Sequence, residues 1–220
     1  IVGTILITIS AKVKIPFYPV PMTMQTFVVL FLLSLTETYA GEKHNSDEWQ
    51  IKAYSSAAPS FIGDFATIIG GDGEILREGT NGWTCQAGNP RPFPKEGWKD
   101  VHEAMPACSD KEAIKWMMAY MQGKTPQLDN DGWMWMLHGD VGEDNSKAGI
   151  LNEKDSTPGQ WIESGPHLML MPKDPSSLDN MNADFTNGAP YVMFPKTIWA
   201  HVMIPVEGYY KYQKESEPKK

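Results

Sequence analysis

Three short β-prone segments of the sequence place histidine and methionine side chains at alternating positions. Alternate residues of a strand point to the same face. The side chains that would share a face are Met134, Met136 and His138 in residues 133–138, His167, Met169 and Met171 in residues 167–171, and His201 and Met203 in residues 199–203. Imidazole with thioether is a ligand set that suits copper, and haem iron uses the same pair. If the three strands are neighbours, the sequence predicts a copper or haem site formed by His138, His167, His201, Met136, Met169 and Met203.

The same pattern has two other interpretations. Methionine supplies adaptable apolar contacts, so these residues could pack a core while each histidine is hydrogen-bonded or solvated near a strand end. Alternatively, one histidine could act as a catalytic base. The sequence contains no G-x-S-x-G elbow and no H-E-x-x-H helix, so the common hydrolase and zinc-protease classes have no motif here. A binding or structural protein is therefore expected ahead of an enzyme.

The chain contains two cysteines, Cys85 and Cys108. In an exported domain we expect them to form a disulfide, because an oxidising compartment favours the bond. Closing this loop should stabilise the fold by roughly 3 kcal/mol. The alternative is a reactive thiol with a histidine as its base, but no signature of a cysteine protease surrounds either residue.

Short β-prone segments separated by glycine and proline make up most of the region after residue 60. The expected strands are residues 65–69 and 74–78, which form a hairpin around Gly70–Gly73, then 133–138, 161–163, 167–171, 191–194 and 198–206. One amphipathic helix is expected over residues 109–123, with Ser109 and Glu112 as a capping box and Gly123 as its end. Four prolines predict a loop over residues 86–108. The predicted fold class is α+β, mainly an antiparallel sheet or partly closed barrel with one helix.

Composition divides the chain into four expected parts. They are an apolar N-terminal segment (1–40), a polar linker (41–59), a β-rich domain (60–212) and a charged, disordered tail (213–220). The formal net charge is -8. An acidic surface repels phosphate backbones, so nucleic acid is not an expected partner. A small ligand or a metal remains compatible with this composition.

The start of the chain carries the string AKVKIPFYPVPMTMQTFVVLFL. This string resembles the first-loop signature of the BioY family, the substrate-binding membrane subunit of bacterial biotin transporters. The resemblance covers about the first 33 residues and implies a membrane-tethered fragment related to biotin uptake. BioY proteins are helical through several membrane spans, and most of their substrate pocket would lie in helices that this chain lacks. No biotin-binding residue is therefore carried over.

The same segment also has the order of a secretory signal. Lys12 and Lys14 precede the apolar residues 27–35, and small residues follow up to Ala40, after which cleavage is expected. If the segment is retained, residues 1–35 would contact the membrane. Both interpretations place this part of the chain in or through a membrane.

The strings LREGTNGWTC, GPHLMLM, GAPYVMF and WAHVMIPV give a second resemblance. On these, residues 65–206 are similar to an uncharacterised group of exported bacterial proteins. The resemblance implies a periplasmic or secreted location and supplies no functional residues. Together the observations predict an exported, non-catalytic binding or structural domain. A periplasmic copper- or haem-binding protein and a membrane-tethered fragment are the alternatives.

Overall fold

The structure, a computed structural model, describes residues 14–15, 22–23 and 44–212. The chain divides into two units, residues 1–42 and 43–220. In the first unit, β1 (Lys14–Ile15) and β2 (Met22–Thr23) form an antiparallel pair. Apart from these four residues, the BioY-like, signal-like and membrane-contact predictions lie outside the described residues, as does the predicted tail. Within the described residues, no helix has the length and apolar character needed to cross a membrane.

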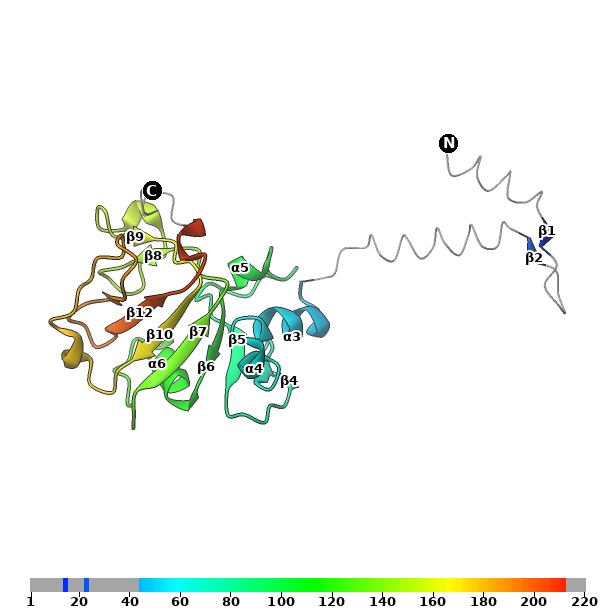
Figure 1. The fold of residues 1–220 in the computed structure, drawn as a ribbon, viewed down its shortest axis with the longest axis horizontal. Helices are drawn as coiled ribbons and strands as arrows, with labels where there is room; N and C mark the ends of the chain where they lie inside the picture. The colour runs from blue at the N-terminus through cyan, green and yellow to red at the C-terminus, as the bar shows by residue number, and fades with distance from the viewer. Residues whose placement is uncertain (1–13, 16–21, 24–43, 213–220) are drawn as a thin grey trace. The chain divides into compact units, whose positions relative to one another are not determined.

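Eight strands of the second unit form one open sheet (Figure 1). In spatial order they are β11 (Tyr191–Met193), β12 (His201–Pro205), β10 (His167–Met171), β7 (Gly132–Met136), β6 (Pro106–Ser109), β5 (Thr84–Ala87), β3 (Thr67–Ile69) and β4 (Ile75–Arg77). All neighbours are antiparallel except β3 and β5, which are parallel. The α+β class with a mainly antiparallel sheet is therefore confirmed. The partly closed barrel is wrong, because β11 and β4 are free edges of the sheet.

The structure contains several helices rather than the single one predicted. They are α3 (Asp47–Ser55), α4 (Ser60–Gly63), α5 (Val101–Ala104) and α6 (Lys111–Met121), with 3-10 turns η1 (Glu153–Asp155), η2 (Pro175–Leu178) and η3 (Tyr209–Tyr212). A second small sheet pairs β8 (Glu143–Asp144) with β9 (Trp161–Ile162).

Helix α6 is the predicted amphipathic helix, but its cap differs from the prediction. Asp110, not Ser109, accepts the first free amides, those of Glu112 at 3.0 Å and Ala113 at 2.8 Å. The other carboxylate oxygen of Asp110 accepts the amide of Trp133 at 2.9 Å. One side chain therefore caps α6 and also fixes the start of the helix to β7. Trp116 and Met117 lie on the buried side of this helix.

Residues 86–108 are not the irregular loop that the prolines predicted. They contain the end of β5, all of α5 and most of β6. Asp100 caps α5 by accepting the amide of Glu103 at 2.8 Å, and Met105 ends the helix with a φ of 49°. Pro106 is the first residue of β6, a position where a strand tolerates proline.

The predicted linker, residues 41–59, also contains regular structure. The side chain of Ser46 accepts the amide of Trp49 and caps α3. Trp49, Ala53 and Tyr54 are buried in this helix, spaced so that they lie on one side of it. These apolar residues pack α3 onto the sheet, so residues 47–55 are part of the folded domain.

The two faces of the sheet have different side chains. Cys85 and Cys108 lie directly opposite each other on β5 and β6 and form the predicted disulfide, with an S–S distance of 2.03 Å. Trp135 packs with them, and α3 covers this side, which we name the disulfide face. Because side chains alternate along a strand, Met134 and Met136 point to the other side. This second side, covered by α6, is named the methionine face.

Candidate functional site: a pocket at the methionine face

The strand registers bring the methionines of separate segments into rows. Met203 on β12 lies opposite Met169 on β10, which lies opposite Met134 on β7. His167 lies opposite Met136 in the next row, on the same side of the sheet. The three strands are therefore neighbours in the sheet, which was the condition set for the predicted site.

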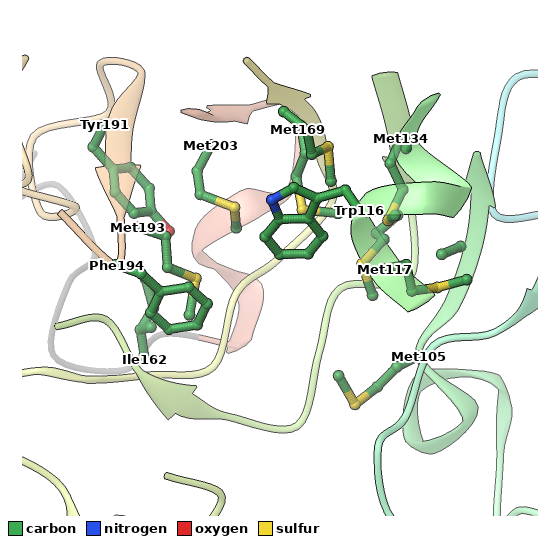
Figure 2. Packing of buried hydrophobic residues seen from close by; sticks show 14 of the residues in the cluster. Met105, Trp116, Met117, Met134, Ile162, Met169, Tyr191, Met193, Phe194 and Met203 are labelled. Carbon is green, nitrogen blue, oxygen red and sulfur yellow. The ribbon is translucent and has the colours of Figure 1, made fainter. Parts of the chain in front are cut away.

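A pocket of about 90 Å³ lies between the methionine face and α6. Its lining includes eight of the chain's thirteen methionines. The lining residues are Gly88, Pro90, Met105, Ala107, Trp116, Met117, Tyr120, Met121, Met134, Met136, Asp140, Glu143, His167, Met169, Met193, Phe194, His201 and Met203. Figure 2 shows several of the methionine side chains around the ring of Trp116. A single water needs roughly 10–15 Å³ by this measure, so the pocket has room for several waters or a small ligand.

Aromatic rings form one wall of the pocket. Trp116 stacks on Tyr120 with ring centroids 5.4 Å apart, and Tyr120 stacks on Phe194 at 5.9 Å. His201 meets Trp116 and Phe194 edge-on, at 4.9 and 5.4 Å. These contacts hold the rigid side of the pocket in place, whereas the thioethers opposite can change rotamer.

His167 supplies a buried lone pair to the pocket. Its Nδ1 lies 2.6 Å from the carbonyl oxygen of Gly165, which can only accept, so Nδ1 carries the proton. Nε2 is therefore left as an acceptor, and it has no hydrogen-bond partner among the described residues. The side chain is 1% exposed, and burial lowers its pKa to about 4. At neutral pH the site thus contains an uncharged imidazole with an unused nitrogen.

His201 lies at the other end of the pocket. Its Nδ1 is 2.9 Å from the carbonyl oxygen of Trp199, and burial lowers its pKa to about 4. His167 is opposite Pro205, four residues beyond His201 on β12. At about 3.3 Å per residue, the two histidine positions are separated by roughly 13 Å along the strands. Met203 lies between them, so the two imidazoles belong to separate ends of one pocket.

His138 does not line the pocket. Strand β7 ends at Met136, and residues 137–138 form a turn before Gly139, whose φ is 66°. The alternation that placed His138 with Met134 and Met136 ends with the strand. The ring of His138 instead lies 2.7 Å through Nε2 from the hydroxyl of Ser56. The structure therefore separates His138 from the other five residues of the predicted metal site, all of which line the pocket.

The contact between Ser56 and His138 does not have the geometry of an activated nucleophile. The Ser56 hydroxyl also lies 2.7 Å from the carbonyl oxygen of Ala53, which can only accept. The hydroxyl proton is directed there, so Nε2 of His138 donates to the serine oxygen. A general base needs the reverse arrangement, with the serine proton directed at the imidazole.

Two carboxyl groups in the pocket were not predicted from the sequence. Asp140 accepts the amides of Gly142 and Ser164, and burial raises its pKa to about 6. Glu143 accepts from the hydroxyl of Tyr120 and the amide of Gly149, and burial raises its pKa to about 7. Both lie in a segment that reads as a polar loop. No periodic pattern in that segment indicates that its acidic side chains turn inwards.

The donor set of the pocket is unusual for a metal centre. Among the described residues, no group of three or more His, Cys, Asp and Glu side chains could hold a metal ion. Zinc and calcium sites are built from such groups. The pocket offers mainly thioethers, which are soft ligands, with imidazoles at its ends. No lysine or arginine is among the lining residues, so the only lining groups that can gain charge near neutral pH are carboxyl groups.

No protein-family model matches the chain, and no curated protein or solved structure matches it either. The resemblances to BioY and to the exported group therefore stay predictions. The geometry and chemistry of the pocket are the observations that bear on its function.

Proposed function

We propose that this chain is an exported, non-catalytic binding protein that holds a small ligand in the pocket at the methionine face. The observation that carries the proposal is Nε2 of His167, which is buried and without a hydrogen-bond partner in the described part of the chain. Leaving a buried polar atom unpaired costs about 1–3 kcal/mol. A ligand that engages this nitrogen would recover that free energy on binding.

Two kinds of observation support export. The disulfide between Cys85 and Cys108 is typical of proteins in oxidising compartments. The signal-like residues 27–40 and the resemblance of residues 65–206 to exported proteins agree with it.

In the described part of the chain, neither the cysteines nor Ser56 is an activated nucleophile, which favours binding over catalysis. Both cysteines are in the disulfide, so neither is a thiolate. The Ser56 hydroxyl donates to a backbone carbonyl rather than to His138. The size of the pocket favours a small molecule or a single ion over haem, because a macrocycle is much larger than a space for several waters.

Methionine-methyl NMR tests whether the pocket accepts a ligand. Protein labelled with 13C at the methionine methyl groups would be titrated with benzene and equilibrated with xenon, both of which enter dry apolar cavities. We expect shifts at the pocket methionines. Met118 and Met181 are exposed, do not line the pocket and serve as internal references.

The matched variants are Ala107→Leu and Met118→Leu. Ala107 lines the pocket, and the larger side chain would fill it, whereas Met118 lies outside it. The proposal expects Ala107→Leu to abolish the shifts and Met118→Leu to leave them in place. Equal shifts at pocket and surface methionines, or none at all with either probe, would contradict it.

A further inference from the structure

Four ligand-type side chains surround one end of the pocket. Met136 lies directly opposite His167 on β7, and Met169 is two residues further along β10 on the same face. Met203 lies opposite Met169 on β12. Side chains that are paired across strands on one face have Cβ atoms about 4.5–5.5 Å apart. Since methionine has three rotatable bonds, these thioethers can converge on a point above the sheet.

The imidazole is held in the form that a metal requires. The Gly165 carbonyl fixes the proton on Nδ1 of His167, which leaves the lone pair of Nε2 unused on a residue that lines the pocket. Metal-ligating histidines ordinarily donate their other N–H to such a carbonyl, and this contact sets the orientation of the ring. Residue 165 has to be glycine, because a Cβ at this position would lie 1.7 Å from the carbonyl oxygen of Tyr209.

The donors select the kind of ion. One imidazole and three thioethers are all uncharged, and soft ligands of this type favour Cu(I) over the harder cations that carboxylates bind. The pocket also contains Asp140 and Glu143 and has no cationic side chain in its lining. A single positive charge is therefore compatible with its electrostatics, whereas a bound anion would face two acidic groups.

We propose that the ligand is a soft monovalent metal ion, Cu(I), bound by Nε2 of His167 and the thioethers of Met136, Met169 and Met203. This inference rests on the proposed function, because it names the ligand class of the same pocket. His201 is not among the ligands, since its position lies roughly 13 Å along the strands from that of His167. His138 lies outside the pocket and supplies no ligand.

The test measures Cu(I) affinity by competition with bicinchoninate, without oxygen and with ascorbate, a reductant that leaves the disulfide intact. The same full-length chain, labelled at the methionine methyl groups, would be titrated with Ag(I) as a redox-inert probe. We expect one ion per chain and shifts centred on Met136, Met169 and Met203. Loss of a ligand should weaken binding at least tenfold, since even second-shell changes cost 10–100-fold.

Four variants complete the test. His167→Gln and Met203→Leu remove proposed ligands, and His138→Gln and Met118→Leu are matched controls outside the pocket. A Met→Leu exchange conserves volume and ordinarily costs less than about 1.5 kcal/mol, so Met203→Leu remains informative if His167→Gln fails to fold. The inference expects both ligand variants to lose affinity and both controls to keep it.

The outcomes separate this inference from the proposed function. Benzene or xenon shifts without Cu(I) or Ag(I) binding would overturn the metal and leave a pocket for a small apolar molecule. Failure of all four probes would overturn both. Equal loss of Cu(I) in His138→Gln or Met118→Leu would also overturn the inference, because the ion would then bind elsewhere.

Discussion

The two faces of the sheet differ in how firmly their side chains are held. The disulfide face is packed with alanine and aromatic side chains under α3, and a covalent bond joins β5 to β6. The methionine face is packed with thioethers under α6 and leaves a pocket of about 90 Å³. One sheet therefore has a cross-linked face and an adaptable face. On the proposed function, stability and binding would be supplied by opposite sides of the same strands.

Replacement of both cysteines by alanine should have the largest effect. The disulfide closes a loop with a sequence separation of 23, and its loss should lower the free energy of unfolding by about 3 kcal/mol. Denaturant-induced unfolding measures this change. If the faces are independent, benzene shifts at the pocket methionines should persist in the double variant. Their disappearance would show that the cross-link also shapes the pocket.

Adding bulk should distinguish the two faces. Ala57 is fully buried in the disulfide-face cluster, so Ala57→Leu should overpack it and cost about 2 kcal/mol. Ala107→Leu makes the same chemical change beside the pocket, where space exists, and should cost less than about 1 kcal/mol. Thermal and denaturant unfolding of the two variants provide the comparison. Equal losses would mean that the methionine face is as tightly packed as the other.

Asp140 should make the stability of the methionine face depend on pH. Burial disfavours the ionised form and raises the pKa of Asp140 from its ordinary value of 3.8 to about 6. Protonated Asp140 contributes to the free energy of unfolding. This contribution is complete below pH 3.8 and is lost as the pH rises through 6. Asp140→Asn should therefore gain about 2 kcal/mol relative to the unsubstituted protein between pH 4 and pH 6.

The difference between the two proteins reports the titration of Asp140 together with its charge coupling to Glu143, whose pKa Asp140 helps to raise. His167 and His201 also line the pocket, and they titrate in both proteins. Free energies of unfolding at several pH values between 4 and 7 give the measurement. A constant difference across that range would show that Asp140 is not the source of the pH dependence.

Asp110→Ala should lower the free energy of unfolding by about 1 kcal/mol, through loss of the α6 cap. Because Asp110 also accepts the amide of Trp133, the change should loosen α6 against β7. We expect increased hydrogen exchange in α6 and the adjoining part of β7, with α3 unchanged. Equal increases in α3 and α6 would argue that the two faces open together.

The sequence predicted the elements whose pattern is local. The alternation of side chains predicted β7, β10 and β12, and the glycine-rich turn predicted the β3–β4 hairpin. The helical spacing of apolar residues predicted α6. The pairing of Cys85 with Cys108 followed from having only two cysteines. Five of the six predicted metal-site residues line one pocket because neighbouring strands keep their faces aligned.

The remaining features depend on contacts that a local pattern does not contain. Helix α3 is mostly polar. It is stabilised by the packing of a few buried residues, such as Trp49 and Tyr54, against the sheet. His138 does not join the other predicted metal-site residues, because β7 ends two residues before it. Strand boundaries are the least predictable part of such a pattern. Asp140 and Glu143 reach the pocket only through the tertiary path of their loop.

The crowding at Gly165 gives a criterion for recognising distant relatives. Any side chain at this position would collide with the backbone of Tyr209 and displace Gly165, whose own carbonyl orients the imidazole. A chain that conserves the site should therefore retain glycine two positions before the histidine and methionine two positions after it. Homologues that share the pocket should keep this spacing together with the His-x-Met pattern of the neighbouring strand β12. Homologues that have lost it would keep only the scaffold.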